Sequence, residues 1–226
     1  MSDHVFLAII EFIVLLLSLT FHECAHAWTA DRLGDPTARY LGRVSLNPIV
    51  HSDLFGTIIF PLVGLMGGGL MFGWAKPVPV NIGNLRHPTR DHMLVAAAGP
   101  VSNMILATLM FSVLMVMKTL SPEVANLVRD VAFGDVPRGT STVALVALFA
   151  FHGMIINVIL ALFNLIPIAP LDGAAVLSGL LPPNMARALQ QLQAYSFVIF
   201  IFLLLSGATS YLFSPPINFL QRVLIT

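Results

Sequence analysis

Residues 5–30 read VFLAIIEFIVLLLSLTFHECAHAWTA, from Val5 to Ala30. The stretch is apolar apart from Glu11 and Ser18 until it reaches the polar residues 22–26. As one helix it would be about 39 Å long at 1.5 Å per residue, which is enough to cross a bilayer with one polar end. It lacks the basic start and the small-residue cleavage site of a signal peptide, so we interpret it as a retained membrane span.

The composition of the whole chain indicates a membrane protein. Of its 226 residues, 57% are hydrophobic and 10% are charged, and the mean hydropathy is +0.89. Soluble domains carry about 25% charged residues. A net charge of zero argues against nucleic-acid binding, and the single cysteine, Cys24, excludes a disulfide framework and a cysteine-based zinc module. The remaining class is a multi-pass protein of the cell membrane, embedded in the lipid bilayer.

Further apolar segments follow the first one, at Leu54–Phe72, Met93–Met117, Thr142–Leu165 and Tyr195–Tyr211. Between them, Gly73–Asn81 carries two prolines and β-branched valines, which favour an extended strand or a hairpin over a helix. We therefore predict an all-α polytopic membrane protein of about four to six transmembrane helices with a small re-entrant or β-hairpin element. Residues 1–226 are expected to form a single domain.

The segment His22-Glu23-Cys24-Ala25-His26 is an H-E-x-x-H motif. On a helix its two histidines face the same side, so both imidazoles can bind one Zn²⁺ while Glu23 acts as general base on the attacking water. The alternative is that both histidines simply face the wet end of the helix. An ionisable cluster inside a membrane span is costly and marks a functional site, and the alternative leaves Glu23 in the span without a partner.

A catalytic zinc ion needs a third protein ligand, and donors within the apolar segments are few. Asp172 is the best candidate, because it is the only acidic residue after Asp135 and follows a stretch that prolines unwind. His152 is the second choice for the third ligand, and Asp172 could instead cap the helix that follows it. Asn164 lies in the same broken stretch, where its amide could hydrogen-bond an oxyanion or could pack between helices.

These residues carry a family resemblance. The H-E-x-x-H motif in a span, together with Asn164-x-x-Pro167-x-x-x-Leu171-Asp172-Gly173, resembles the site-2 protease family of intramembrane zinc metalloproteases. Four further segments resemble its compact subgroup without PDZ or CBS domains: Leu33–Arg39, Leu46–Pro48 with His51 and Asp53, Phe72–Asn81 and Ala98–Asn103. The resemblance implies zinc binding by His22, His26 and Asp172, water activation by Glu23 and an oxyanion role for Asn164. It also implies an N-terminus outside the cell and a metal near the cytoplasmic side.

The metal site places a condition on the topology. His22 and His26 lie near the end of the first span, and Asp172 lies just past the end of Thr142–Leu165. The two spans must therefore run in the same direction, with an odd number of crossings between them. Because Met93–Met117 supplies one crossing, residues 54–81 should return to the side they left. The alternative is that residues 54–72 cross and the following segment crosses back.

Other polar residues have simpler interpretations. Cys24 is rotated away from the zinc face and is expected to pack, and Glu11 could pair across the bundle or face a wet cavity. His51 and Asp53 either line a cavity mouth or belong to a solvated loop. Lys76 is expected to extend to the membrane interface.

The function predicted from these residues is cleavage of a transmembrane helix in a single-span membrane protein by a zinc endopeptidase. A metal-ion or proton transporter using the same His, Glu and Asp side chains is the alternative, although transporters usually show internal repeats and none is visible here.

Overall fold

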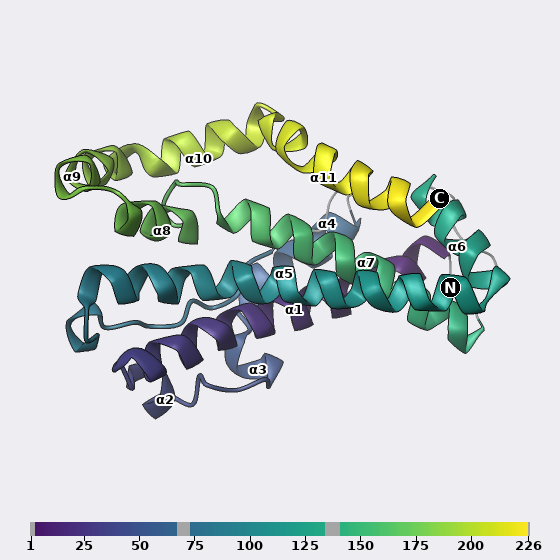
Figure 1. The fold of residues 1–226 in the computed structure, drawn as a ribbon, viewed down its shortest axis with the longest axis horizontal. Coiled ribbons are helices and arrows are strands. Elements are labelled where there is room, and N and C mark those ends of the chain that lie inside the picture. Colours follow the sequence, from purple (N-terminus) through teal and green to yellow (C-terminus); the bar gives the residue numbers. More distant parts are fainter. Residues whose placement is uncertain (1–2, 67–72, 134–140, 226) are drawn as a thin grey trace.

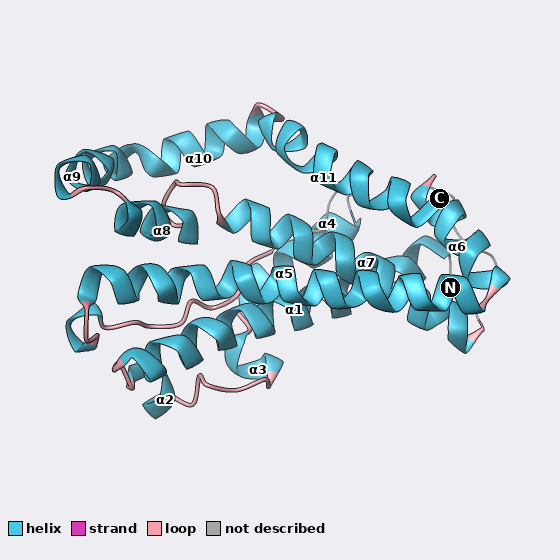
Figure 2. Cartoon of the chain, viewed as in Figure 1, coloured by secondary structure: helices cyan, strands magenta, loops and turns pink. Residues whose placement is uncertain are grey.

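Three long helices dominate the computed structural model, which describes residues 3–66, 73–133 and 141–225 (Figure 1). They are α1 (Asp3–Leu33), α5 (Pro88–Leu120) and α7 (Thr142–Asn164), and each contains a stretch long and apolar enough to cross a membrane. No other helix in the described ranges meets both conditions, so three candidate spans are found where about four to six were expected. The helical class of the protein is as predicted (Figure 2).

Local sequence explains where the long helices begin and end. Residues 3–33 contain neither proline nor glycine, and α1 ends before Gly34, whose φ of +115° suits glycine. Helix α5 begins with Pro88 in its first turn, where no backbone donor is needed. At the start of α7, the Ser141 hydroxyl accepts a hydrogen bond from the Ala144 amide.

Side-chain contacts fix the relative directions of the three helices. Residues further along α1 contact residues with lower sequence numbers on α5 and residues with higher sequence numbers on α7. The contacts are Glu11–His152, Ser18–Asn157, His22–Asn103 and His26–Val95. Helices α1 and α7 therefore run parallel with α5 antiparallel between them, which is the arrangement that a shared metal site requires.

Small residues let α7 approach its neighbours closely. Ala147, Ala150 and Gly153 are buried at intervals of three residues along one side of the helix. A Cβ at Gly153 would lie 3.2 Å from the Met110 side chain of α5. Close packing of this kind matters in lipid, because the hydrophobic effect does not drive one membrane helix against another.

The segment between α1 and α5 returns to its own starting point. After α2 (Thr37–Tyr40) and α3 (Pro48–His51), a π-helical turn at Leu54–Ile59 leads into α4 (Phe60–Met66). The Trp74 amide then donates to the Gly56 carbonyl, so the chain comes back beside the beginning of the turn. This closure agrees with the return expected for residues 54–81.

The predicted β hairpin is not found, since none of the described residues forms a strand. Residues 73–81 have no regular secondary structure until a 3₁₀ turn at Ile82–Asn84. Pro77 and Pro79 cannot donate hydrogen bonds, and the Lys76 and Val78 amides donate to the His51 carbonyl and the Glu23 carboxylate. Few backbone donors are left for a ladder.

The remaining helices cover the two ends and one side of the bundle. Helix α6 (Pro122–Ala132) lies at one end, and α8 (Asp172–Leu180) packs on α5 near the other (Figure 1). An arm of α9 (Pro183–Leu192), a short turn at Gln193–Tyr195, α10 (Ser196–Leu205) and α11 (Ala208–Ile225) then returns along one side. The expected span over Tyr195–Tyr211 is thus broken, because Gly207 adopts a φ of +70° between α10 and α11.

Candidate metal centre

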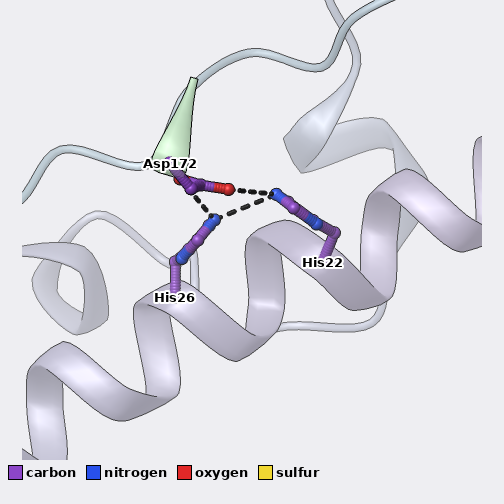
Figure 3. A group of neighbouring side chains, drawn as sticks. All are labelled: His22, His26 and Asp172. Carbon is purple, nitrogen blue, oxygen red and sulfur yellow. Dashed lines mark hydrogen bonds and ion pairs between the residues drawn. The ribbon is translucent and has the colours of Figure 1, made fainter. Parts of the chain in front are cut away.

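Two histidines and an aspartate converge as the sequence predicts. His22 and His26 lie one turn apart on α1, and their Nε2 atoms are 3.0 Å apart. The Asp172 carboxylate reaches them from the first residue of α8, with Oδ2 3.1 Å from His22 Nε2 and Oδ1 3.4 Å from His26 Nε2 (Figure 3). Both histidines are buried, at 4% and 8% exposure. One potential ligand atom from each of the three residues lies within 4.8 Å of the others.

The turn that carries Asp172 depends on the glycine after it. Helix α7 ends at Asn164, and residues 165–171 lead to the start of α8. A Cβ on Gly173 would lie 2.3 Å from the Leu165 carbonyl oxygen, so only glycine fits against the end of α7. The Asp172-Gly173 pair therefore sets the carboxylate at the depth of the α1 histidines.

Helix α5 forms one wall of the site through Gly99. A Cβ at this position would lie 2.4 Å from His26 Nε2 and 2.6 Å from His22 Cε1. The absence of a side chain at residue 99 leaves the space in which both imidazoles turn their Nε2 atoms toward Asp172. The sequence places Gly99 within the segment Ala98–Asn103 but indicates no individual role for it.

The outer nitrogens of both imidazoles are also held. His26 Nδ1 lies 2.7 Å from the Val95 carbonyl oxygen, and His22 Nδ1 lies 2.6 Å from Asn103 Oδ1. A backbone carbonyl can only accept, so His26 donates from Nδ1, and Nε2 is the ring nitrogen that faces the site. Asn103 was not proposed as a site residue from the sequence, and its position in a span offers only a weak signal.

This donor set fits a divalent metal ion. Two imidazole nitrogens and a carboxylate oxygen are the usual three protein ligands of catalytic zinc, which keeps a fourth position open. Asp172 Oδ2 is buried and accepts no hydrogen bond within the described residues. A divalent cation bound here would be shared by two imidazole nitrogens and one carboxylate oxygen.

Glu23 lies beside this group and is bound by the returning loop. Its side chain is buried, and Oε2 accepts a hydrogen bond of 2.9 Å from the Val78 amide. Arg43 holds the same loop by donating to the carbonyls of Lys76 and Pro77. Nothing in the sequence distinguishes Arg43 from the other charged residues of this connecting segment, although a buried arginine is unusual.

Asn164 is close to Asp172 in the sequence, but its side-chain amide is hydrogen-bonded within its own helix. Its Nδ2 donates to the Leu160 carbonyl, 3.0 Å away in the same helix. The amide is thus engaged within α7, and the expected contact with an oxyanion stays a prediction.

The other candidates lie outside the group. Glu11 and His152 form an ion pair of 3.1 Å, which confirms the pairing role for Glu11 and places His152 away from the third-ligand position. Cys24 is half-buried with a free thiol and is not among the grouped ligands. His51 is buried against the Ser45 carbonyl, and so it does not belong to a solvated loop. Asp53 caps the π-helical turn through the Phe55 and Gly56 amides.

Comparison with known proteins gives a consistent result. The model of peptidase family M50 matches residues 10–207. YwhC of Bacillus subtilis, named as a candidate zinc metalloprotease, is 37% identical over 206 residues, which cover 91% of this chain and 84% of YwhC. Rip2 of Mycolicibacterium smegmatis, named in the same way, is 30% identical over 193 residues, which cover 85% of this chain and 65% of Rip2.

Rip2 of Mycobacterium tuberculosis strain H37Rv is also 30% identical, over 84% of this chain and 64% of its own length. No solved structure gives a significant match. The matched residues include the whole of His22–His26 and Asp172, around which the structure builds its group of possible metal ligands. The chain belongs to peptidase family M50, the site-2 protease family, and is a zinc metalloprotease.

Proposed function

We propose that this enzyme cuts peptide bonds within or near transmembrane helices of single-span proteins in the cell membrane. One observation carries the proposal: α1 and the start of α8, which follows α7, bring together the two histidines, the aspartate and Glu23, and both α1 and α7 are apolar enough to cross a bilayer. His22, His26 and Asp172 would hold one zinc ion, within a single catalytic domain over residues 1–226. The protein would be a multi-pass membrane protein.

The chain supplies a base at the correct place. When bound, zinc polarises the scissile carbonyl and makes a water molecule more acidic. Glu23 takes the proton of the attacking water and delivers it to the leaving amine. The Val78 amide holds Oε2, which fixes the carboxylate and leaves Oε1 to accept the proton. Asn164 would support the oxyanion once its amide leaves the Leu160 carbonyl.

The substrate must present an unwound backbone. In a helix the carbonyl groups are hydrogen-bonded to the following turn, so local unwinding has to precede attack. Residues 73–81 pass directly over Glu23, and an extended substrate segment beside them could be aligned by backbone hydrogen bonds. Helix-breaking residues near the cut should therefore increase the cleavage rate.

The test is cleavage of a labelled single-span protein by the purified full chain in detergent. Glu23→Gln should bind zinc as the wild type does and should cleave about 10²–10⁴ times more slowly, the usual contribution of a positioned base. Glu123→Gln is the matched control, because this acidic residue lies on α6 and contacts Ser141. If the wild type and Glu23→Gln both bind zinc and cleave at equal rates, or neither cleaves any transmembrane substrate, the proposal fails.

A further inference from the structure

A chain of buried polar side chains connects the three long helices behind His22. It contains Ser18 on α1, Asn103 on α5 and Asn157 on α7, with exposures of 2%, 0% and 2%. These side chains reach the site through His22 Nδ1, whereas His22 Nε2 is the atom that faces His26 and Asp172. We propose that Asn157 and Asn103 are positioning residues that fix the tautomer of His22 and so set the affinity of the site for metal. The proposal rests on the metal site of the proposed function.

The donor and acceptor roles in this series of hydrogen bonds are set by the orientation of the Asn157 amide. Its Nδ2 lies 2.8 Å from the Gly153 carbonyl oxygen and 2.9 Å from Ser18 Oγ. The backbone carbonyl can only accept, so the NH₂ group of Asn157 must face it. The amide oxygen of Asn157 is therefore the atom that faces Asn103.

The orientation of the Asn157 amide in turn fixes the orientation of the Asn103 amide beside His22. Its Nδ2 lies 2.7 Å from Asn157 Oδ1 and 3.3 Å from the Ser18 carbonyl oxygen, and both of these atoms are acceptors. The NH₂ group of Asn103 must point that way, which leaves its Oδ1 for His22 Nδ1 at 2.6 Å. An oxygen acceptor at this distance requires the proton of His22 to be on Nδ1.

The tautomer decides whether His22 can be a ligand. With the proton on Nδ1, the Nε2 lone pair faces His26 and Asp172, whereas the other tautomer would place a proton there. His26 is fixed by the Val95 backbone, which side-chain substitution cannot remove. The orientation of the His22 ring depends on side chains from two other helices. Substitution of those side chains can therefore remove the contact that holds the ring. Outer partners of metal-binding histidines are worth about 10–100-fold in affinity.

A purely structural role for the two asparagines makes a different prediction. Polar side chains that join membrane helices contribute to stability wherever they lie. Their loss need not change the protonation of the His22 imidazole. The test must therefore measure metal affinity and the His22 tautomer, in addition to folding.

The variants are Asn103→Leu and Asn157→Leu in the full chain, with Thr20→Val as control. Thr20 is buried two residues from His22, and its hydroxyl donates only to the Leu16 carbonyl of its own helix. In competition with a chelator, Asn103→Leu should bind zinc about 10–100 times more weakly than the wild type. Asn157→Leu should lose less, because Asn103 keeps its contact with His22, and Thr20→Val should bind as the wild type does.

A second measurement does not require a substitution of Asn103 or Asn157. Nitrogen NMR of the metal-free wild type, labelled at histidine, should show His22 protonated on Nδ1, with the signal assigned by its loss in His22→Gln. An unprotonated Nδ1 overturns the proposal, as does wild-type zinc affinity in folded Asn103→Leu or an equal loss in Thr20→Val. If the wild type binds no zinc, the proposed function fails. The tautomer measurement then still shows whether Asn103 and Asn157 fix the protonation of His22.

Discussion

Helix α1 takes part in two clusters of histidine and carboxylate, one with α7 and one with α8, and only the second is arranged for a metal. At Glu11–His152, Nδ1 of the imidazole faces one carboxylate oxygen at 3.1 Å, and its buried Nε2 has no hydrogen-bond partner among the described residues. At His22, His26 and Asp172, both imidazoles turn their Nδ1 atoms to outer acceptors and direct Nε2 to a common point. The residue types are alike, and the outer partners make the difference.

The backbone around each cluster differs as well. Gly99 leaves open the space between the two α1 histidines, because any side chain there would lie against their rings. At the other cluster, His152 packs edge-to-face against its neighbour Phe151. A metal centre in this bundle thus requires outer acceptors and a gap in the wall, in addition to histidines and an acid.

The largest expected effect comes from closing that gap. Gly99→Ala should abolish zinc binding, because its Cβ would lie 2.4 Å from His26 Nε2 and displace the ring. The measurement is zinc content after purification, with thermal unfolding as the check on folding. Gly153→Ala is the matched control, since its Cβ would meet the flexible Met110 side chain at 3.2 Å. Equal zinc in Gly99→Ala and the wild type would show that the wall is not needed.

A third carboxylate sharpens the comparison, since hydrogen bonds alone satisfy it. Asp35, just after α1, is fully buried and accepts from Thr37, Asn81 and Asn84. Burial raises the pKa of its carboxyl, but these hydrogen bonds outweigh burial and hold the pKa below its ordinary value. Asp35→Asn should lower the free energy of unfolding by about 1–3 kcal/mol at neutral pH, as expected when buried donors lose their acceptor.

This contribution has a defined pH dependence. Because the pKa of Asp35 is lower in the folded state, its stabilisation is complete above the unfolded value of about 4 and is lost as the pH falls through the folded value. The difference between wild type and Asp35→Asn should therefore shrink in acid, as measured by unfolding in mixed micelles at several pH values. The exposed Asp130→Asn serves as control. A difference that is constant from pH 7 to pH 3 would contradict the assignment.

Breaking the Glu11–His152 pair should have a smaller effect, and one confined to stability. Glu11→Leu leaves His152 without its partner and should cost about 0.5–2 kcal/mol, the range measured for polar contacts between membrane helices. Zinc affinity should stay within about twofold of the wild type, because none of the groups that hold His22 or His26 changes. Loss of zinc in this variant would mean that the two clusters are coupled.

The smallest effect is expected at Cys24. The thiol lies inside the H-E-x-x-H motif but is absent from the group of possible metal ligands. Cys24→Ala should change neither zinc content nor the cleavage rate, as checked by the same two assays. A measurable fall in zinc affinity would show that the thiol takes part in binding.

Much of the site could be predicted because its spacing is local or its residue types are rare. His22 and His26 must share a face of any helix, since four residues make about one turn. Asp172 stood out because acidic residues are scarce in the second half of the chain. Gly99, Val95 and Asn103 could not be found in this way, because they act through contacts between helices about 70–80 positions apart in the chain.

The sequence by itself determined the class of protein, the long apolar helices and the identity of the three candidate ligands. Composition and periodicity decide these features, since they depend on neighbours in the chain. Only the tertiary structure decided the rest. Amides of residues 73–81 donate to Gly56, His51, Glu23 and Asp35, and these residues form no strand. The expected last span breaks at Gly207. The tautomer of His22 depends on α1, α5 and α7 meeting, and no single stretch of sequence contains that information.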